Sequence, residues 1–135
     1  MKRRETVDKK KILFACIGNC CRSQMAEGFA KKVAGDRFDI YSAGTRPAGF
    51  VHPDAIAVMK ELGIDISAQY SKGFNQVPAK NLDYLVTMGC EKTCPAVAAK
   101  KQFDWQIEDP IGQPIEVFRR VRDGIKARVE GFLSS

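Results

Sequence analysis

The segment of residues 16–23 combines the side chains of a nucleophile and an anion-binding group. It reads Cys-Ile-Gly-Asn-Cys-Cys-Arg-Ser, with the thiol of Cys16 and the guanidinium of Arg22 six positions apart. An apolar run at 12–15 predicts a strand before it, and the pattern at 24–33 predicts a helix after it. A loop between a strand and a helix directs successive backbone N–H groups to one point, where the helix N-terminus adds positive potential. The segment therefore predicts a binding site for a tetrahedral oxyanion.

Cys16 and Arg22 are expected to play different parts in that site. Arg22 can bind two oxygens of the anion at once, because its guanidinium donates in a planar fork that lysine lacks. The positive field that holds the anion also stabilises a thiolate at Cys16, and the Ser23 hydroxyl can donate to that thiolate. The alternative is that Cys16 is a small buried residue at a strand end. The combination of residue types in one loop favours a nucleophile.

The backbone of the whole loop is expected to contact the oxyanion. Gly18 allows close approach of the backbone, and Asn19 tolerates a left-handed conformation. Cys20 is interpreted as a packing residue, with a second redox function as the alternative. The predicted oxyanion-binding residues are Ile17, Gly18, Asn19, Cys20, Cys21, Arg22 and Ser23.

The elements that must hold this loop alternate between strand and helix patterns. Strands are predicted at 12–16, 38–43, 84–88 and 103–106. Helices are predicted at 24–33, with Met25, Phe29 and Val33 on one face, at 53–63, with Ile56, Met59 and Leu62 toward the core, and at 115–133. This alternation predicts a parallel sheet covered on both faces, with ligands bound at the carboxyl ends of the strands. The loop at 16–23 follows the first such end.

The composition indicates one cytoplasmic domain with a charged N-terminal arm. The chain has 135 residues, of which 44% are hydrophobic and 28% charged, and no apolar run approaches membrane-spanning length. Residues 1–10 are expected to form a flexible basic arm and residues 11–135 a single domain, and no apolar segment typical of a secretory signal follows the arm. Aromatic residues do not interleave with the charges of the arm, so a solvated tail is favoured over a nucleic-acid contact. Neither nucleic acid nor a membrane is an expected partner.

A second cysteine-bearing segment follows the third predicted strand. Residues 88–95 read Met-Gly-Cys-Glu-Lys-Thr-Cys-Pro, so Cys90 and Cys94 are expected at the same edge of the sheet as Cys16. The chain has five cysteines, and an odd number in a cytoplasmic protein indicates thiol chemistry or metal binding over a disulfide scaffold. A metal pair would need two more ligands, for which two other cysteines and the single histidine remain. We expect no metal site, and two incidental loop cysteines are the further alternative.

Several segments of the sequence resemble one known family. The pattern Cys-X5-Arg-Ser after a first strand is similar to that of the low-molecular-weight protein tyrosine phosphatases and of the thiol-dependent arsenate reductases related to them. The reductases in particular resemble this chain at 23–28, 41–44 and 108–110, which read Ser-Gln-Met-Ala-Glu-Gly, Tyr-Ser-Ala-Gly and Glu-Asp-Pro. They also resemble the stretch 51–67, which begins with Val-His-Pro and ends with Gly-Ile-Asp-Ile-Ser. The resemblance implies a flavodoxin-like three-layer α/β/α sandwich with a four-stranded parallel sheet. It also implies chemistry on a tetrahedral oxyanion through a cysteine adduct.

The same resemblance implies roles for residues outside the first loop. Asp109, which precedes Pro110, matches the general acid that protonates the leaving oxygen. Phosphatases of the family often have an aromatic residue next, where this chain has Ile111, which suits a small inorganic substrate. Cys90 matches the thiol that attacks the nucleophile, and Cys94 the thiol that takes over the disulfide. The close spacing of this pair leaves the order of attack open.

The resemblance also bears on a bound cation. Some reductases of the family hold a potassium ion near the loop asparagine, and Asn19, Glu27 and Ser42 match part of that site. Lys72 stands where a further acidic ligand is expected, so its ammonium would replace the cation and no potassium site is predicted. The chain has neither a dinucleotide-binding glycine pattern nor a Walker lysine motif, and no cofactor is expected.

These features favour an arsenate reductase that releases arsenite by a relay of cysteines. Arsenate or phosphate would bind the loop, and thioredoxin, or glutaredoxin with a small thiol, would reduce the enzyme again. One alternative is a low-molecular-weight phosphatase that hydrolyses phosphate monoesters through a phosphocysteine. Another is a non-catalytic thiol module that senses redox state or metalloids, against which Arg22 and Asp109 argue.

Overall fold

The computed structural model describes residues 9–89 and 97–134. Its elements in chain order are β1 (Lys10–Cys16), α1 (Arg22–Ala34), β2 (Phe38–Gly44), α2 (Pro53–Lys60), the 3₁₀ helix η2 (Phe74–Gln76), β3 (Leu82–Thr87), β4 (Ala99–Asp104) and α3 (Ile115–Ser134). β1 begins one residue before the predicted boundary between arm and domain. The order of strands and helices agrees with the alternation of patterns in the sequence.

The four strands form one parallel sheet in the order β2-β1-β3-β4. Cys16 at the end of β1 pairs with Gly44 of β2, and Ala15 pairs with Thr87 of β3, which in turn pairs with Asp104 of β4. The carboxyl ends of all four strands therefore meet at one edge of the sheet. The predicted parallel sheet is confirmed, and the loop after Cys16 begins at this edge.

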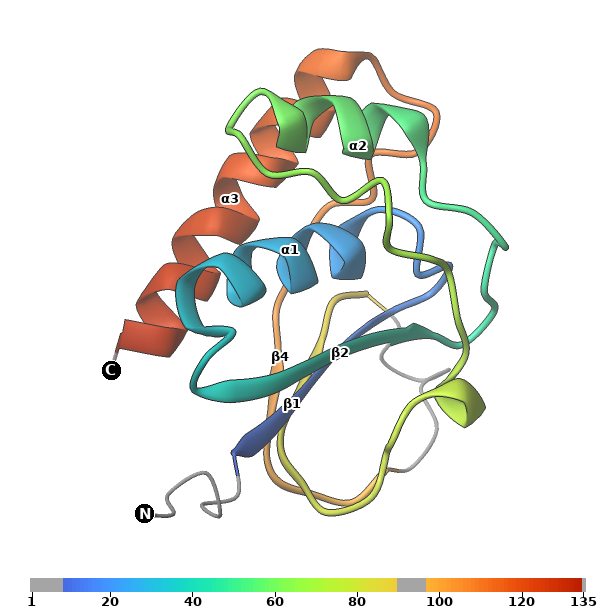
Figure 1. Cartoon of the computed structure of the whole chain (residues 1–135). Helices are drawn as coiled ribbons and strands as arrows, with labels where there is room; N and C mark the ends of the chain where they lie inside the picture. The colour runs from blue at the N-terminus through green and yellow to red at the C-terminus, as the bar shows by residue number, and fades with distance from the viewer. Residues whose placement is uncertain (1–8, 90–96, 135) are drawn as a thin grey trace.

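The two faces of the sheet are covered differently (Figure 1). Helices α1, α2 and α3 pack on one face, where Ile12 and Phe14 of β1 are buried with them. Leu13 and Ala15 belong to the other face, which within the described residues is covered by η2, through Phe74, and by its flanking segments. β1 is thus buried on both faces, which is why its sequence is an unbroken apolar run. The α/β sandwich expected from the sequence is confirmed.

Two residues predicted to face the core are partly exposed instead. Val33 is 39% exposed and Leu62 is 36% exposed. Each step of four residues advances by about 40° around an α-helix, so at the end of α1 the core is contacted by Ala34 in place of Val33. Helix α2 ends at Lys60 and the chain then turns, with a φ of +77° at Gly63, so helical spacing no longer applies to Leu62.

The boundaries of several elements also differ from the prediction, most of all those of β4. β4 lies at Ala99–Asp104, where the sequence predicted a strand at 103–106. It is the edge strand of the sheet and most of its side chains are exposed, so its sequence lacks the apolar run of a buried strand. Helix α1 begins at Arg22, two residues before its predicted start, so the last residues of the predicted anion loop form the first turn of the helix. Among the residues that the structure describes, no helix has both the length and the apolar character that a membrane crossing requires.

A charged cluster joins α2 to α3. Arg122 is nearly buried and donates to Val58 O at 2.9 Å and to Glu61 Oε1 at 2.7 Å. Arg119 Nη2 donates to Glu61 Oε2 at 2.8 Å. These bonds, first from Arg119 and then from Arg122, lower the pKa of Glu61 to about 2. The cluster therefore holds together the two helices that pack beside α1.

Candidate active site

The loop that follows β1 is tied down through its carbonyl groups. Four of them accept backbone hydrogen bonds from the segment after β2: Cys16 O from Thr45 N at 3.2 Å, Ile17 O from Arg46 N at 2.8 Å, Gly18 O from Ala48 N at 2.9 Å and Cys20 O from His52 N at 2.9 Å. In a trans peptide the next N–H points opposite to the carbonyl, so the N–H groups that follow these carbonyls turn away from residues 45–52. The loop can thus present several N–H donors to one anion, and the binding of an oxyanion there stays a prediction.

Cys16 is buried at the base of this loop and contacts a hydroxyl. Its Sγ lies 2.9 Å from Ser23 Oγ, and that oxygen also accepts a hydrogen bond from Asn19 Nδ2 at 2.8 Å. Either the thiol or the hydroxyl can donate in this contact. A thiolate at Cys16 could only accept, and a hydrogen bond donated to the charged form of a group favours that form. The Ser23 hydroxyl therefore lies where it can donate to a thiolate at Cys16.

Asn19 connects the loop to the elements behind it. It is fully buried, with the left-handed φ of +47° that the sequence analysis expected of this asparagine. Its Oδ1 accepts hydrogen bonds from Gln24 Nε2 at 2.8 Å and from the backbone N of Lys72 at 2.9 Å, while its Nδ2 also donates to Ser42 Oγ at 3.0 Å. With all these bonds made, the asparagine fixes the orientation of the amide that contacts Ser23.

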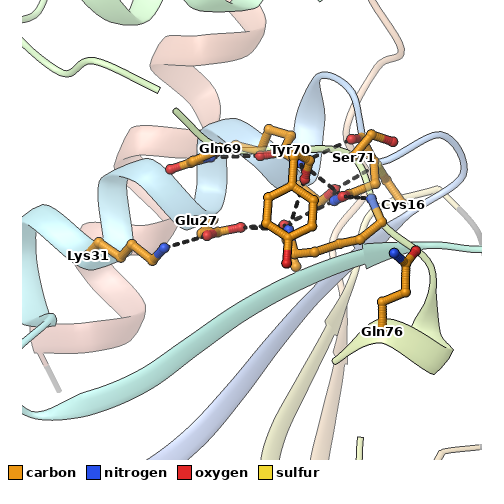
Figure 2. Close-up of polar contacts among 12 residues, drawn as sticks. Cys16, Glu27, Lys31, Gln69, Tyr70, Ser71 and Gln76 are labelled. Carbon is orange, nitrogen blue, oxygen red and sulfur yellow. Dashed lines mark hydrogen bonds and ion pairs between the residues drawn. The ribbon is translucent and has the colours of Figure 1, made fainter. Parts of the chain in front are cut away.

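Lys72 places a buried ammonium group beside the loop asparagine. The side chain is only 6% exposed, and its Nζ lies 3.1 Å from Ser42 Oγ, 3.1 Å from Tyr70 O and 3.4 Å from Glu27 Oε1. Ser42 Oγ also donates to Glu27. Figure 2 shows Lys31 reaching Glu27 from the side away from Cys16, where its Nζ lies 2.6 Å from Glu27 Oε2. Burial lowers the pKa of Lys72, and the Glu27 carboxylate opposes that effect.

The position of Lys72 agrees with the expectation that its ammonium takes the place of a cation. The oxygens of Glu27, Ser42 and Tyr70 that surround the Nζ atom are the kind of ligand that a hard cation takes. Within the described part of the chain, no three His, Cys, Asp or Glu side chains lie close enough together to hold a metal ion.

Arg22 and Asp109 lie together beside the loop. Arg22 is 6% exposed, and its Nη1 donates to Ile107 O at 3.2 Å, while its Nη2 lies 3.6 Å from Asp109 Oδ2. The Asp109 side chain is half-exposed, and its Oδ1 accepts a hydrogen bond from Ile111 N at 3.1 Å. The two residues are 87 positions apart in the sequence, and the structure brings them together. Their roles in anion binding and acid catalysis stay predictions.

Two glycines that the sequence analysis did not single out shape this site. A Cβ atom at Gly89 would lie 2.1 Å from Arg22 Nη1, and a Cβ atom at Gly44 would lie 2.6 Å from Ile17 O and 2.8 Å from Asn19 N. Gly89 also has a φ of +96°. Gly44 ends β2 and Gly89 follows β3, so both lie at the edge of the sheet where the loop lies. Their position near the carboxyl end of a strand is the feature of the sequence that could have identified them as site residues.

The remaining cysteines of the loop lie side by side. The Sγ atoms of Cys20 and Cys21 are 4.0 Å apart, and both residues are buried. This contact lowers the pKa of Cys20 and, together with burial, raises that of Cys21. Cys90 and Cys94 lie outside the described residues, but Gly89, which precedes Cys90, lies against the Arg22 guanidinium.

His52 caps the start of helix α2. Its Nδ1 accepts a hydrogen bond from Asp54 N at 3.1 Å at the start of α2, with Pro53 in the first helical position. Its ring packs against Phe118 of α3 at 4.9 Å between centroids. The only histidine of the chain therefore has a structural role, and the site has no imidazole base.

Comparison with known proteins places this site in a family. Residues 11–135 match the sequence model of the low molecular weight phosphotyrosine protein phosphatases. The chain belongs to this family. A curated member, arsenate reductase 2 of Staphylococcus epidermidis, is 46% identical over 129 residues, which cover 93% of this chain and 98% of the relative. Another, the glutaredoxin arsenate reductase of Synechocystis sp., is 44% identical over 128 residues, which cover 93% and 97%. A solved structure of an arsenate reductase in the oxidized state has a TM-score of 0.85 at 43% identity and covers 93% of this chain and 97% of that chain.

As a member of the low molecular weight phosphatase family, the chain has its predicted site residues in three places. The predicted nucleophile and anion-binding residues lie between Cys16 and Ser23, and Asp109, the predicted acid, lies beside Arg22 in the segment after β4. The roles predicted for Cys90 and Cys94 fall on residues outside the described part of the chain and stay predictions.

Proposed function

We propose that this member of the phosphatase family is an arsenate reductase that takes the two electrons for each arsenite from its own cysteines. The observation that carries the proposal is the 2.9 Å contact between Cys16 Sγ and Ser23 Oγ in a loop that also contains Arg22. It combines a hydroxyl that favours a thiolate with an anion-binding guanidinium. The similarity of nearly the whole chain to arsenate reductases, at 46% and 44% identity, supports the choice of substrate.

In the first step the loop binds arsenate and Cys16 attacks the arsenic. Arg22 and the N–H groups of residues 17–23 hold the anion and stabilise the charge that builds on its oxygens. A sulfur–arsenic bond forms and an arsenic–oxygen bond breaks, and Asp109 supplies the proton that turns the leaving oxygen into hydroxide or water. Asp109 lies beside Arg22, which suits this role.

In the second step a cysteine relay reduces the arsenic. Cys90 attacks Cys16, a disulfide forms between them, and the electron pair of the broken sulfur–arsenic bond stays on arsenic, which leaves as arsenite. Cys94 then attacks Cys90, which frees the Cys16 thiolate and leaves a disulfide between Cys90 and Cys94. Two thiols thus supply the two electrons that the reduction consumes.

A dithiol reductant completes the cycle by reducing the disulfide of Cys90 and Cys94. The name of the Synechocystis relative contains glutaredoxin, and we propose that thioredoxin, or glutaredoxin with a small thiol, serves this chain. The relay needs reduced thiols at the start of each turnover, which fits a cytoplasmic protein.

A second candidate function is hydrolysis of phosphate monoesters. The arrangement of Cys16, Arg22 and Asp109 favours it, because the same attack and proton transfer would form and release a phosphocysteine. One observation argues against a phosphotyrosine substrate. Ile111, which is 47% exposed, follows Pro110 at the position where many phosphatases have an aromatic residue.

One pair of variants separates the two functions. Arsenite release and aryl phosphate hydrolysis are measured for wild type, Cys16→Ser and Cys90→Ser, with thioredoxin, glutaredoxin–glutathione and mycothiol systems in parallel. We expect Cys16→Ser to lose both activities, and Cys90→Ser to lose arsenite release but keep slow phosphate hydrolysis. Equal loss of both activities in Cys90→Ser would assign that residue a structural role. Unchanged arsenite release would contradict the relay and favour direct attack by an external thiol.

A further inference from the structure

Cys20 and Cys21 form a pair of adjacent thiols whose side chains the proposed mechanism does not use. Their Sγ atoms lie 4.0 Å apart, and both cysteines are free. Their neighbour Cys16 is the nucleophile, so the pair lies in the loop where arsenite would be produced. This inference rests on the proposed function for its biological meaning, although the pair itself is a feature of the structure.

The backbone on both sides of the pair is fixed. Cys20 O accepts a hydrogen bond from His52 N, and Cys21 O accepts one from Met25 N in the first turn of α1, each at 2.9 Å. Both side chains are at most 3% exposed, packed in the main core cluster. The two sulfurs are therefore held next to each other with little freedom to move apart, and a bidentate ligand would lose little entropy on binding them.

The Cys20 sulfur lies near the proposed catalytic groups. The charges of Asp109 and Arg22 both act on its thiol, and a Cβ atom at Gly18 would lie 3.3 Å from its Sγ. The charges of Asp109 and Cys16 act on the Cys21 thiol, so both thiols of the pair lie near the proposed catalytic groups.

A disulfide is a poor fit to this pair, whereas a one-atom bridge suits it. Disulfides in proteins usually join Cα atoms ~4.4–6.8 Å apart, but adjacent residues across a trans peptide have Cα atoms only ~3.8 Å apart. An atom inserted between the two sulfurs relaxes that constraint. Thiolates select soft, thiophilic centres, and trivalent arsenic is one that bonds two thiols at a time.

We propose that Cys20 and Cys21 form a dithiol site that captures trivalent arsenic, the product of the neighbouring reaction. The Cys20 thiolate bonds to arsenic and displaces one hydroxide of arsenous acid, which takes the proton of the Cys21 thiol and leaves as water. The Cys21 thiolate then displaces a second hydroxide. The product is one arsenic atom bound to both sulfurs with its third hydroxyl retained, and no oxidation takes place.

The ionisation of the two thiols agrees with this order of events. The contact between them lowers the pKa of Cys20, which favours it as the first nucleophile. The same contact and burial raise the pKa of Cys21, so this thiol enters the reaction with its proton. Bound arsenic would lie over the anion site, so the captured product is expected to inhibit further binding of arsenate.

Binding of phenylarsine oxide, a trivalent arsenical that bridges dithiols, tests the site without any turnover. The Cys90→Ser/Cys94→Ser double variant removes the other cysteine pair, and its adduct is followed by intact mass after washing with glutathione. Cysteines left free are then alkylated in the unfolded protein and mapped. We expect about one phenylarsenic group per chain, with Cys20 and Cys21 protected and Cys16 alkylated. Adding 2,3-dimercaptopropanol should remove the group.

Two further variants in the same background assign the adduct to one pair of sulfurs. Cys16→Ser should keep it, and Cys20→Ser should retain at least tenfold less after the glutathione wash. Protection of Cys16 with Cys21, an undiminished adduct in Cys20→Ser, or no adduct at all would overturn the proposal. If Cys20→Ser does not fold, as judged by circular dichroism, the proposal is tested by the alkylation map of the Cys90→Ser/Cys94→Ser variant alone. These outcomes are independent of arsenite release, so failure of this site and failure of the proposed function are distinguishable.

Discussion

The Ser23 hydroxyl lies 2.9 Å from the Cys16 sulfur and its oxygen also accepts a hydrogen bond from Asn19, so the hydroxyl is placed to donate to a thiolate at Cys16. Ser23→Ala removes this donor and should lower kcat/KM for arsenate by about ten- to a hundredfold, because a hydrogen bond to a charged group contributes ~1.5–3 kcal/mol. The rate of Cys16 alkylation by iodoacetamide near neutral pH should fall with it. Ser67→Ala, in the loop after α2, is the control and should leave both rates unchanged. Wild-type rates in Ser23→Ala would remove Ser23 from the account.

Gly89 and Gly112 offer a matched pair for testing the position of Arg22. Both have positive φ, +96° and +84°, so alanine is strained at either position. Only at Gly89 would the added Cβ collide with Arg22 Nη1, at 2.1 Å, whereas nothing lies within 4 Å at Gly112. Gly89→Ala should lower kcat/KM by about a hundredfold, the order expected when one oxyanion donor is displaced. Gly112→Ala should stay within a few-fold of wild type.

One result for the Gly89→Ala and Gly112→Ala variants would contradict the proposed dependence of Arg22 on Gly89. If the two alanine variants have similar activity, the guanidinium does not depend on the space above Gly89. Urea denaturation of both variants checks that any loss of activity exceeds the loss of folded protein.

The buried pair of Lys72 and Glu27 should be strongly coupled in stability. Within the described residues, Lys72→Met leaves the nearly buried Glu27 with Lys31 as its only cationic partner, and breaking a buried pair costs ~3–5 kcal/mol. We expect a loss of about 3 kcal/mol in the free energy of unfolding, which Glu27→Gln in the same chain partly restores. Wild type should be equally stable in sodium and potassium chloride, because the ammonium lies where a cation would bind. A wild-type protein that potassium stabilises would contradict this arrangement.

Glu61 should make stability depend on pH in the acidic range. Its pKa is about 2 in the folded protein against an ordinary 4.5, so it stabilises the fold above pH 4.5 and loses that effect as the pH falls toward 2. The urea midpoint of wild type should therefore fall more between about pH 6 and about pH 3 than that of Glu61→Gln. Glu130→Gln, which removes an exposed partner of Lys126, is the control and should follow wild type. Parallel curves for wild type and Glu61→Gln would refute the role of the cluster.

The parts of the site that lie close together in the sequence were predictable from it. Residues 16–23 fold as one loop, so the contact of Cys16 with Ser23 and the left-handed backbone of Asn19 follow from local residue types. The alternation of strands and helices was also predictable, and β1 could be recognised because its residues 12–16 form an apolar run that is buried. The edge strand β4 has no such signal, and its position was misjudged by several residues.

The contacts between distant segments could not be derived from the pattern of residues. Gly89 is required because the Arg22 side chain happens to cross it, and neither residue type specifies the other. The hydrogen bond of Arg22 to Ile107 O depends on the path of the segment after β4. The position of Lys72 against Glu27 was expected from the family resemblance and not from the spacing of the two residues.

Single turnover without any reductant tests the central claim that the electrons come from the chain itself. Fully reduced enzyme, freed of small thiols, is mixed with excess arsenate, and both arsenite and remaining thiols are counted. A two-electron reduction by internal cysteines should release about one arsenite per chain and consume two thiols, with a disulfide between Cys90 and Cys94 found by peptide mapping. Release of arsenite only after an external thiol is added, or without any loss of protein thiols, would contradict the account.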